Sequence, residues 1–91
     1  MPSVLAVDDS ASMRQMESFT LKNTGFNVVE AVDGENAYDK ANSADFNLVL
    51  TDQSMPILDG IGLTKKLRAN PKFKSTPILI PTTESGDHMT R

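Results

Sequence analysis

Cysteine is absent from this sequence of 91 residues, and histidine occurs only once. Without cysteine the chain can form neither disulfides nor thiolate metal sites, although this absence leaves the redox compartment undetermined. The single histidine, His88, lies among the last few residues, and we expect it to be exposed and to serve as neither a base nor a metal ligand. Any metal chemistry in this chain therefore has to depend on oxygen ligands.

An excess of positive charge and long apolar runs are also missing. Nine Lys and Arg residues against twelve Asp and Glu residues give a net charge of −3 at pH 7, so no basic field is available to attract a nucleic-acid backbone or an anionic membrane. The apolar runs are only a few residues long, and the N-terminus shows neither a membrane span nor a secretory signal. We therefore expect no nucleic-acid partner, no membrane partner and a cytoplasmic location.

What is present is a balance of 38% hydrophobic and 23% charged residues, which permits one globular domain. Short apolar runs alternate with segments of helical spacing, and Asp33-Gly34 indicates a turn. We expect strands at residues 4–7, 26–31, 46–50 and 78–80, and helices at residues 11–22, 35–42, 61–69 and, as first turns only, 84–91. This alternation predicts an α/β fold with a parallel sheet, helices on both faces and ligands beyond the carboxyl ends of the strands.

Three aspartates follow expected strands directly. Asp8 and Asp9 follow the first strand and Asp52 follows the third, so neighbouring strands would bring three carboxylates to one rim of the sheet. Each residue alone has a simpler interpretation, since Asp8 or Asp9 can cap a helix and Asp52 can be a turn residue. Together they would repel one another unless a cation neutralised them. An oxygen-only ligand set favours a hard cation such as Mg²⁺, which also accepts phosphate oxygens.

The residues around these aspartates form a specific pattern. Asp52 is followed by Met55-Pro56 and Asp59-Gly60, which we interpret as residues that shape the loop, and Val7-Asp8-Asp9-Ser10 lies upstream. With this pattern the sequence resembles the receiver domain of two-component response regulators, most closely the chemotaxis-type, CheY-like members. The resemblance implies a flavodoxin-like (CheY-like) doubly wound parallel sheet of order 2-1-3-4, in which the family's fifth strand and last helix are missing. Residues 1–91 are thus expected to form a single truncated receiver domain.

The resemblance also implies residue roles. Asp52 would accept a phosphoryl group from a phosphohistidine on a histidine kinase. Mg²⁺ would be bound directly by Asp9 and Asp52, by Asp8 through water, and by the main-chain carbonyl of Ser54. Thr82 would be the switch hydroxyl that hydrogen-bonds the phosphate, although it can equally cap the helix expected from residue 84. The output would be a protein target. The chain would not be an enzyme, except that it could catalyse its own phosphorylation and dephosphorylation.

The pattern breaks where the family's fifth strand supplies a lysine that contacts the phosphoryl oxygens, because no residue of this chain matches it. By analogy with the loss of one preorganised donor in other enzymes, about 2.7–4 kcal/mol of transition-state stabilisation would be missing, so we expect impaired phosphorylation. The uncovered sheet predicts a homodimer or an exchange of elements between copies. Pro81 at the fourth strand and Glu17 on the first helix fit an open sheet, although Pro81 can simply end the strand and Glu17 can point to water.

Three other functions remain as alternatives. The first is a receiver fragment that no longer signals and folds by association. The second is a flavin-binding flavodoxin-like domain, but Asp8-Asp9 has the wrong charge for the anion-binding loop that such a domain needs. The third is a phosphatase with an aspartate nucleophile. That family separates its two acids by one residue after the first strand, whereas Asp8 and Asp9 are adjacent and the candidate nucleophile, Asp52, lies elsewhere.

Other conspicuous side chains have structural interpretations. We expect Met13 and Met16 to face the sheet as part of the core, and Tyr38 to be a packing residue. A local group of basic residues is expected to form mainly a solvated helix face; its members are Lys65, Lys66, Arg68, Lys72 and Lys74.

Overall fold

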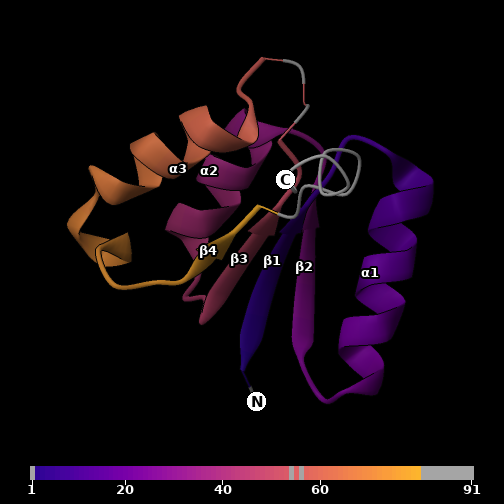
Figure 1. The fold of residues 1–91 in the computed structure, drawn as a ribbon. Coiled ribbons are helices and arrows are strands. Elements are labelled where there is room, and N and C mark those ends of the chain that lie inside the picture. Colours follow the sequence, from indigo (N-terminus) through magenta and orange to yellow (C-terminus); the bar gives the residue numbers. More distant parts are fainter. Residues whose placement is uncertain (1, 54, 56, 81–91) are drawn as a thin grey trace, which may run out of the picture.

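The computed structural model describes residues 2–53, 55 and 57–80 and contains a parallel sheet between two helical layers. The strands are β1 (Ser3–Val7), β2 (Asn27–Ala31), β3 (Leu48–Thr51) and β4 (Ile78–Leu79), and the helices are α1 (Ala11–Asn23), α2 (Gly34–Ser43) and α3 (Gly60–Arg68), with a short 3-10 helix η1 (Pro71–Phe73). The strand order is β2-β1-β3-β4, which confirms the predicted order. Figure 1 shows α1 on one face of the sheet and α2 and α3 on the other.

Strand β1 occupies the middle of the sheet and pairs with two parallel neighbours. Val4 lies beside Val28 of β2 and Leu48 of β3, and the same register continues to the end of the strand. Residues 4–7 are at most 1% exposed, so the strand is buried on both faces. This explains why its sequence is a continuous apolar run without alternation.

The main core fills the space between the sheet and the layer formed by α2 and α3. It includes Leu5 and Val49 from the sheet, Ala37 and Ala41 from α2, and Leu63 from α3. Small alanines on α2 let this helix lie close to the strands, while larger side chains from the other elements fill the remaining volume. This packing fixes the positions of β1 and β3 relative to each other.

Several element boundaries differ from the sequence-based expectation. Asp33 and Gly34 do not form a separate turn: Asp33 is the N-cap of α2, its side chain accepts a hydrogen bond from the Asn36 amide, and Gly34 is the first helical residue. A Cβ atom at Gly34 would lie 2.3 Å from the Leu58 carbonyl oxygen, so the close approach of the loop before α3 requires glycine here. Strand β3 starts at Leu48, two residues later than expected, and Phe46 is a buried residue that precedes it.

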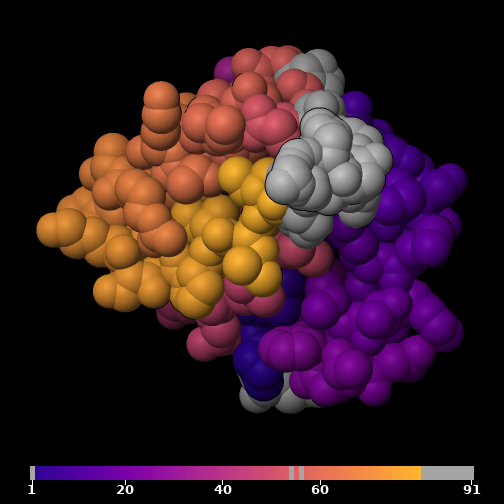
Figure 2. Space-filling view, viewed as in Figure 1, coloured from indigo at the N-terminus to yellow at the C-terminus, as the bar shows by residue number. Residues whose placement is uncertain are grey.

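The prediction that Met13 and Met16 belong to the core is wrong. Their exposed fractions are 43% and 64%, and that of Phe19 is 69%. The physical reason is the placement of α1, which packs mainly on β1 and β2 and buries only Ser18. Met13 and Met16 are left beside Leu50 of β3. In Figure 2, α1 lies on the right of the molecule and α3 with β4 on the left.

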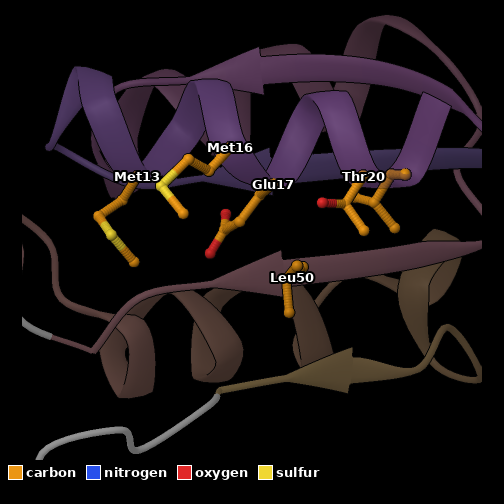
Figure 3. Close-up of a pocket in the computed structure, with 6 residues that line it drawn as sticks. Met13, Met16, Glu17, Thr20 and Leu50 are labelled. Carbon is orange, nitrogen blue, oxygen red and sulfur yellow. The ribbon is translucent and has the colours of Figure 1, made fainter. Parts of the chain in front are cut away.

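A groove of about 280 Å³ lies between α1 and β3. We call it the α1 groove; it is lined by Met13, Met16, Glu17, Thr20, Leu21 and Leu50. Figure 3 shows the side chains of Met13, Met16 and Glu17 extending from α1 toward β3, where Leu50 forms the opposite wall. The groove is therefore largely apolar, with one carboxylate inside it.

The basic residues at the end of α3 and in η1 are exposed, as expected, and three of them also make local contacts. The Lys66 ammonium lies 4.6 Å from the centroid of the Tyr38 ring, and Arg68 donates a hydrogen bond to the Phe73 carbonyl. The Lys72 ammonium donates to the Ala41 carbonyl at 3.1 Å. These contacts hold α2, α3 and η1 together, and Tyr38 packs against the core as expected. Within the described part of the chain, each helix is too short or too polar to span a bilayer.

Candidate metal centre

The pairing of β1 with β3 brings the residues that follow these strands to the same rim of the sheet. Val7 lies beside Thr51 in the parallel register, and the Asp52 amide donates a hydrogen bond of 2.9 Å to the Val7 carbonyl. The Asp8 amide continues the pairing on the other side, where it donates to the Ala31 carbonyl at 3.1 Å. Asp8 and Asp52 therefore leave adjacent strands at the same level.

Three carboxylates meet at this rim. Asp8, Asp9 and Asp52 each offer one oxygen, and these oxygens all lie within 4.8 Å of one another. Asp8 is 5% exposed, Asp52 is half-buried and Asp9 is exposed, so the cluster extends from the interior to the surface. The oxygen-only donor set and the open outer side fit a cation that keeps several waters, as Mg²⁺ does. These residues could hold Mg²⁺.

The loop after β3 is folded against the start of α3, which fixes Asp52 from its other side. The Gln53 carbonyl accepts a hydrogen bond from the Gly60 amide at 3.1 Å, and the Gln53 side chain accepts one from the Ile61 amide at 2.9 Å. A Cβ atom at Gly60 would lie 2.6 Å from the Asp52 carbonyl oxygen, so a side chain there would displace the loop. Gln53 is a positioning residue that the sequence did not reveal, because an amide side chain in a loop has no distinctive pattern.

Met55 and Asp59 support the same loop in different ways. Met55 is buried in the core, where the Thr51 hydroxyl lies 3.9 Å from its sulfur. Asp59 is the N-cap of α3: one carboxylate oxygen accepts a hydrogen bond from the Gly62 amide at 2.8 Å, and the other accepts one from the Gln53 side chain at 3.1 Å. The expected role of these residues in shaping the loop thus has a specific physical basis in packing and capping.

Glu17 adds a fourth carboxyl group near the cluster. It is half-buried in the α1 groove, and within the described residues its Oε1 atom is buried without a hydrogen-bond partner. Burial raises the pKa of Glu17, and the negative charges of Asp8 and Asp52 raise this pKa further. Because Glu17 lines the groove and one of its oxygens is buried, the side chain lies inside the groove rather than pointing to water.

Arg14 is a second residue near the site that the sequence did not single out. Its guanidinium donates a 2.7 Å hydrogen bond to the main-chain carbonyl of Asp8 and lies 3.0 Å from a carboxylate oxygen of Glu30. The only sequence signal was an arginine one turn into the first helix, which is common on solvated helix faces.

Some predicted site residues lie outside the described residues. These are Ser54, with its expected carbonyl ligand, and Thr82, with its expected switch hydroxyl. The same holds for Pro81, His88 and the helix expected from residue 84. Their roles stay predictions.

Comparison with known proteins identifies the class to which this fold and acidic rim belong. The response regulator receiver domain family matches residues 4–91, so the chain belongs to this family. Proteins of this family with the CheY architecture are signalling proteins and are generally not classed as enzymes.

Individual relatives place the chain close to chemotaxis proteins. It is 42% identical over 85 residues to chemotaxis protein CheY1 of Helicobacter pylori. This alignment covers 91% of this chain and 68% of that protein. It is 40% identical over 85 residues to a CheY homolog of Campylobacter jejuni, covering 91% of this chain and 65% of that protein. The structure of CheY4 of Vibrio cholerae superposes with a TM-score of 0.87 at 41% identity, covering 98% of this chain and 76% of that one. The chain thus spans about two thirds of the length of these two sequence relatives.

Proposed function

We propose that this chain is a phosphoacceptor module of a two-component signalling system, with Asp52 as the residue that accepts the phosphoryl group. The observation that carries the proposal is the convergence of Asp8, Asp9 and Asp52 at one rim of the sheet, with oxygens within 4.8 Å, in a chain of the receiver family. A histidine kinase would be the donor, and a protein would be the output target. The expected cytoplasmic location agrees with this role.

In the proposed transfer, a carboxylate oxygen of Asp52 forms a bond to phosphorus while the bond between phosphorus and the imidazole nitrogen of the donor breaks. That nitrogen keeps the electron pair of the broken bond, and the ring, which carries a proton on its other nitrogen, leaves as neutral imidazole. Val7 and Gly60 contribute by fixing the main chain of Asp52, so that its carboxylate is oriented before the donor arrives. The chain would also catalyse its own dephosphorylation.

Mg²⁺ is the cation that the donor set fits best. Asp9 and Asp52 would bind it directly, Asp8 through water, and the Ser54 carbonyl would complete the set. When bound, it would neutralise negative charge on the carboxylates and on the incoming phosphoryl oxygens. Thr82 would hydrogen-bond the new phosphate.

The test is incubation of the chain with MgCl₂ and a small phosphodonor such as acetyl phosphate, followed by mass spectrometry. We expect a gain of one phosphoryl group that disappears in Asp52→Asn and on chelation of Mg²⁺, and binding of beryllofluoride as a mimic. Asp59→Asn is the matched control, because Asn also caps helices and this residue belongs to the same loop. Labelling of Asp52→Asn, or an unlabelled parent chain that binds no Mg²⁺, would exclude the proposal.

The second candidate function is an assembly protein that does not signal and forms a homodimer through exposed apolar side chains or by exchange of elements. The exposed side chains of Met16 and Phe19 on α1 and of Leu79 on β4, the last strand of the sheet within the described residues, favour it, because burying them against a second copy would remove apolar surface from water.

Sedimentation velocity over a range of micromolar concentrations tests the homodimer. We expect a dimer that dissociates in Phe19→Ser, while Ile61→Ser, which changes an exposed isoleucine on α3, leaves it intact. A folded, stable monomer throughout this range would eliminate the dimer.

A further inference from the structure

Arg14 connects the acidic rim to the neighbouring strand through two different acceptors. Its Nη1 atom donates a hydrogen bond of 2.7 Å to the main-chain carbonyl of Asp8, and its Nε atom donates one of 3.0 Å to Glu30 on β2. The other carboxylate oxygen of Glu30 accepts a hydrogen bond of 2.9 Å from the Ser18 hydroxyl. The Arg14 side chain is only 15% exposed, so it is fixed by packing as well as by these bonds.

The acceptor on Asp8 matters because a peptide unit is planar. The Asp8 carbonyl and the Asp9 amide belong to one rigid plane, so a donor that fixes the direction of the carbonyl also fixes the direction in which the chain continues to Asp9. Two other groups of Asp8 are also hydrogen-bonded: its amide donates to the Ala31 carbonyl, and its side chain accepts from the Ser10 amide at 2.8 Å. Arg14 thus supplies a further restraint on this turn.

The Glu30 carboxylate keeps the guanidinium in place. The hydrogen bond from Ser18 is the main cause that lowers the pKa of Glu30, and Arg14 lowers this pKa further. Glu30 therefore stays ionised at neutral pH, and its charge-assisted bond to Arg14 persists. Lysine could not replace this arrangement, because its single nitrogen lacks the planar fork that reaches two separate acceptors.

We propose that Arg14 is a positioning residue of the Mg²⁺ site, which holds the Asp8–Asp9 peptide so that the Asp9 carboxylate is directed toward Asp52. This inference rests on the proposed function. It differs from a purely structural role, in which Arg14 would only attach α1 to β2 and its loss would weaken the fold without a specific effect on the site.

The experiment compares Arg14→Met, Arg14→Lys and Ser18→Ala in the 91-residue chain by calorimetric titration with Mg²⁺, at a temperature where thermal unfolding shows each variant to be folded. Ser18→Ala is the matched control, because Ser18 contacts one oxygen of Glu30 and does not touch Asp8. A glutamate without this bond is still ionised at neutral pH, so the other oxygen of Glu30 keeps its bond to Arg14 in this variant. We expect the Kd for Mg²⁺ to rise about tenfold in Arg14→Met and several-fold in Arg14→Lys, and to stay within about twofold in Ser18→Ala. Equal Kd values in all variants, or an equal rise in Ser18→Ala, would overturn the proposal.

A second measurement needs no metal. Hydrogen exchange of the Ser10 amide, which is bonded to the Asp8 side chain, reports on the same turn. We expect exchange about tenfold faster in Arg14→Met than in Ser18→Ala, and equal rates would contradict the role of Arg14. If the unsubstituted chain binds no Mg²⁺, the proposed function fails, and the exchange rates alone decide whether Arg14 orients this peptide.

Discussion

The surroundings of Glu17 disfavour its negative charge. One carboxylate oxygen is buried in the α1 groove without a hydrogen-bond partner among the described residues, and Asp8 and Asp52 add like charges nearby. We expect Glu17→Gln to raise the free energy of unfolding at pH 7 by about 1 kcal/mol, and Glu17→Leu to raise it more, because leucine leaves no polar atom unpaired. Urea unfolding of the three proteins measures this order, and a loss of stability in both variants would contradict it.

The same residue predicts a dependence on pH. The pKa of Glu17 in the folded chain is raised by burial above its ordinary value of 4.5, so its contribution to stability is fully present below pH 4.5 and is lost as the pH rises through the folded pKa. The stability advantage of Glu17→Gln over the parent chain should therefore be small at pH 4 and grow toward neutral pH. Urea unfolding between these values tests it, and an advantage that shrinks with rising pH would contradict the assignment.

Ile57 carries backbone strain in the loop before α3. Its φ angle is 72°, in the left-handed region that a β-branched residue rarely adopts, and its side chain is exposed. We expect Ile57→Asn to raise the free energy of unfolding by about 1 kcal/mol, because asparagine tolerates this conformation and little apolar contact is lost. Thermal unfolding of Ile57→Asn is compared with that of Ile61→Asn, which changes an exposed position within a helix. The comparison separates relief of strain at Ile57 from a general effect of asparagine on stability.

At the scale of elements, the hydrophobic pattern predicted the strands and helices well and their packing less well. Residues 4–7 could be assigned because a strand buried on both faces needs a continuous apolar run. The position of Met13 and Met16 could not be predicted, because helical spacing shows which residues share a side of α1 but not over which strands that side lies. Phe46 was assigned to a strand because it is apolar, but its burial arises from packing before β3 starts.

The candidate site likewise contains contacts that the sequence could predict and contacts that it could not. The convergence of Asp8 and Asp52 was predictable, because it requires only that two parallel strands be neighbours. Gln53 and Arg14 were not, because their contacts depend on the path of a loop and on the rotation of a helix. The roles of Ser54 and Thr82 stay predictions.

The start of α3 gives a prediction at this scale. The Asp59 side chain caps the helix and also holds Gln53, so Asp59→Ala removes both interactions, whereas Asp59→Asn keeps a capping oxygen. We expect Asp59→Ala to lower the free energy of unfolding by about 1–2 kcal/mol and Asp59→Asn by less than about half of that. Equal losses in denaturant unfolding would show that charge rather than capping matters at this position.

For the whole molecule, the acidic rim connects folding to metal binding. Asp8, Asp9 and Asp52 are drawn together only when β1 and β3 pair, and their repulsion opposes that pairing, so a cation that binds the folded rim must stabilise the entire sheet. At a Mg²⁺ concentration one hundred times its Kd, the free energy of unfolding should rise by about 2.7 kcal/mol. Calorimetry with increasing MgCl₂ measures this as a rise in Tm that chelation reverses.

Asp9→Asn should remove most of this rise in Tm. Asp39→Asn, which changes an exposed aspartate on α2, should retain it. An equal rise in both variants would mean that Mg²⁺ acts through general screening of the acidic chain and not at the rim.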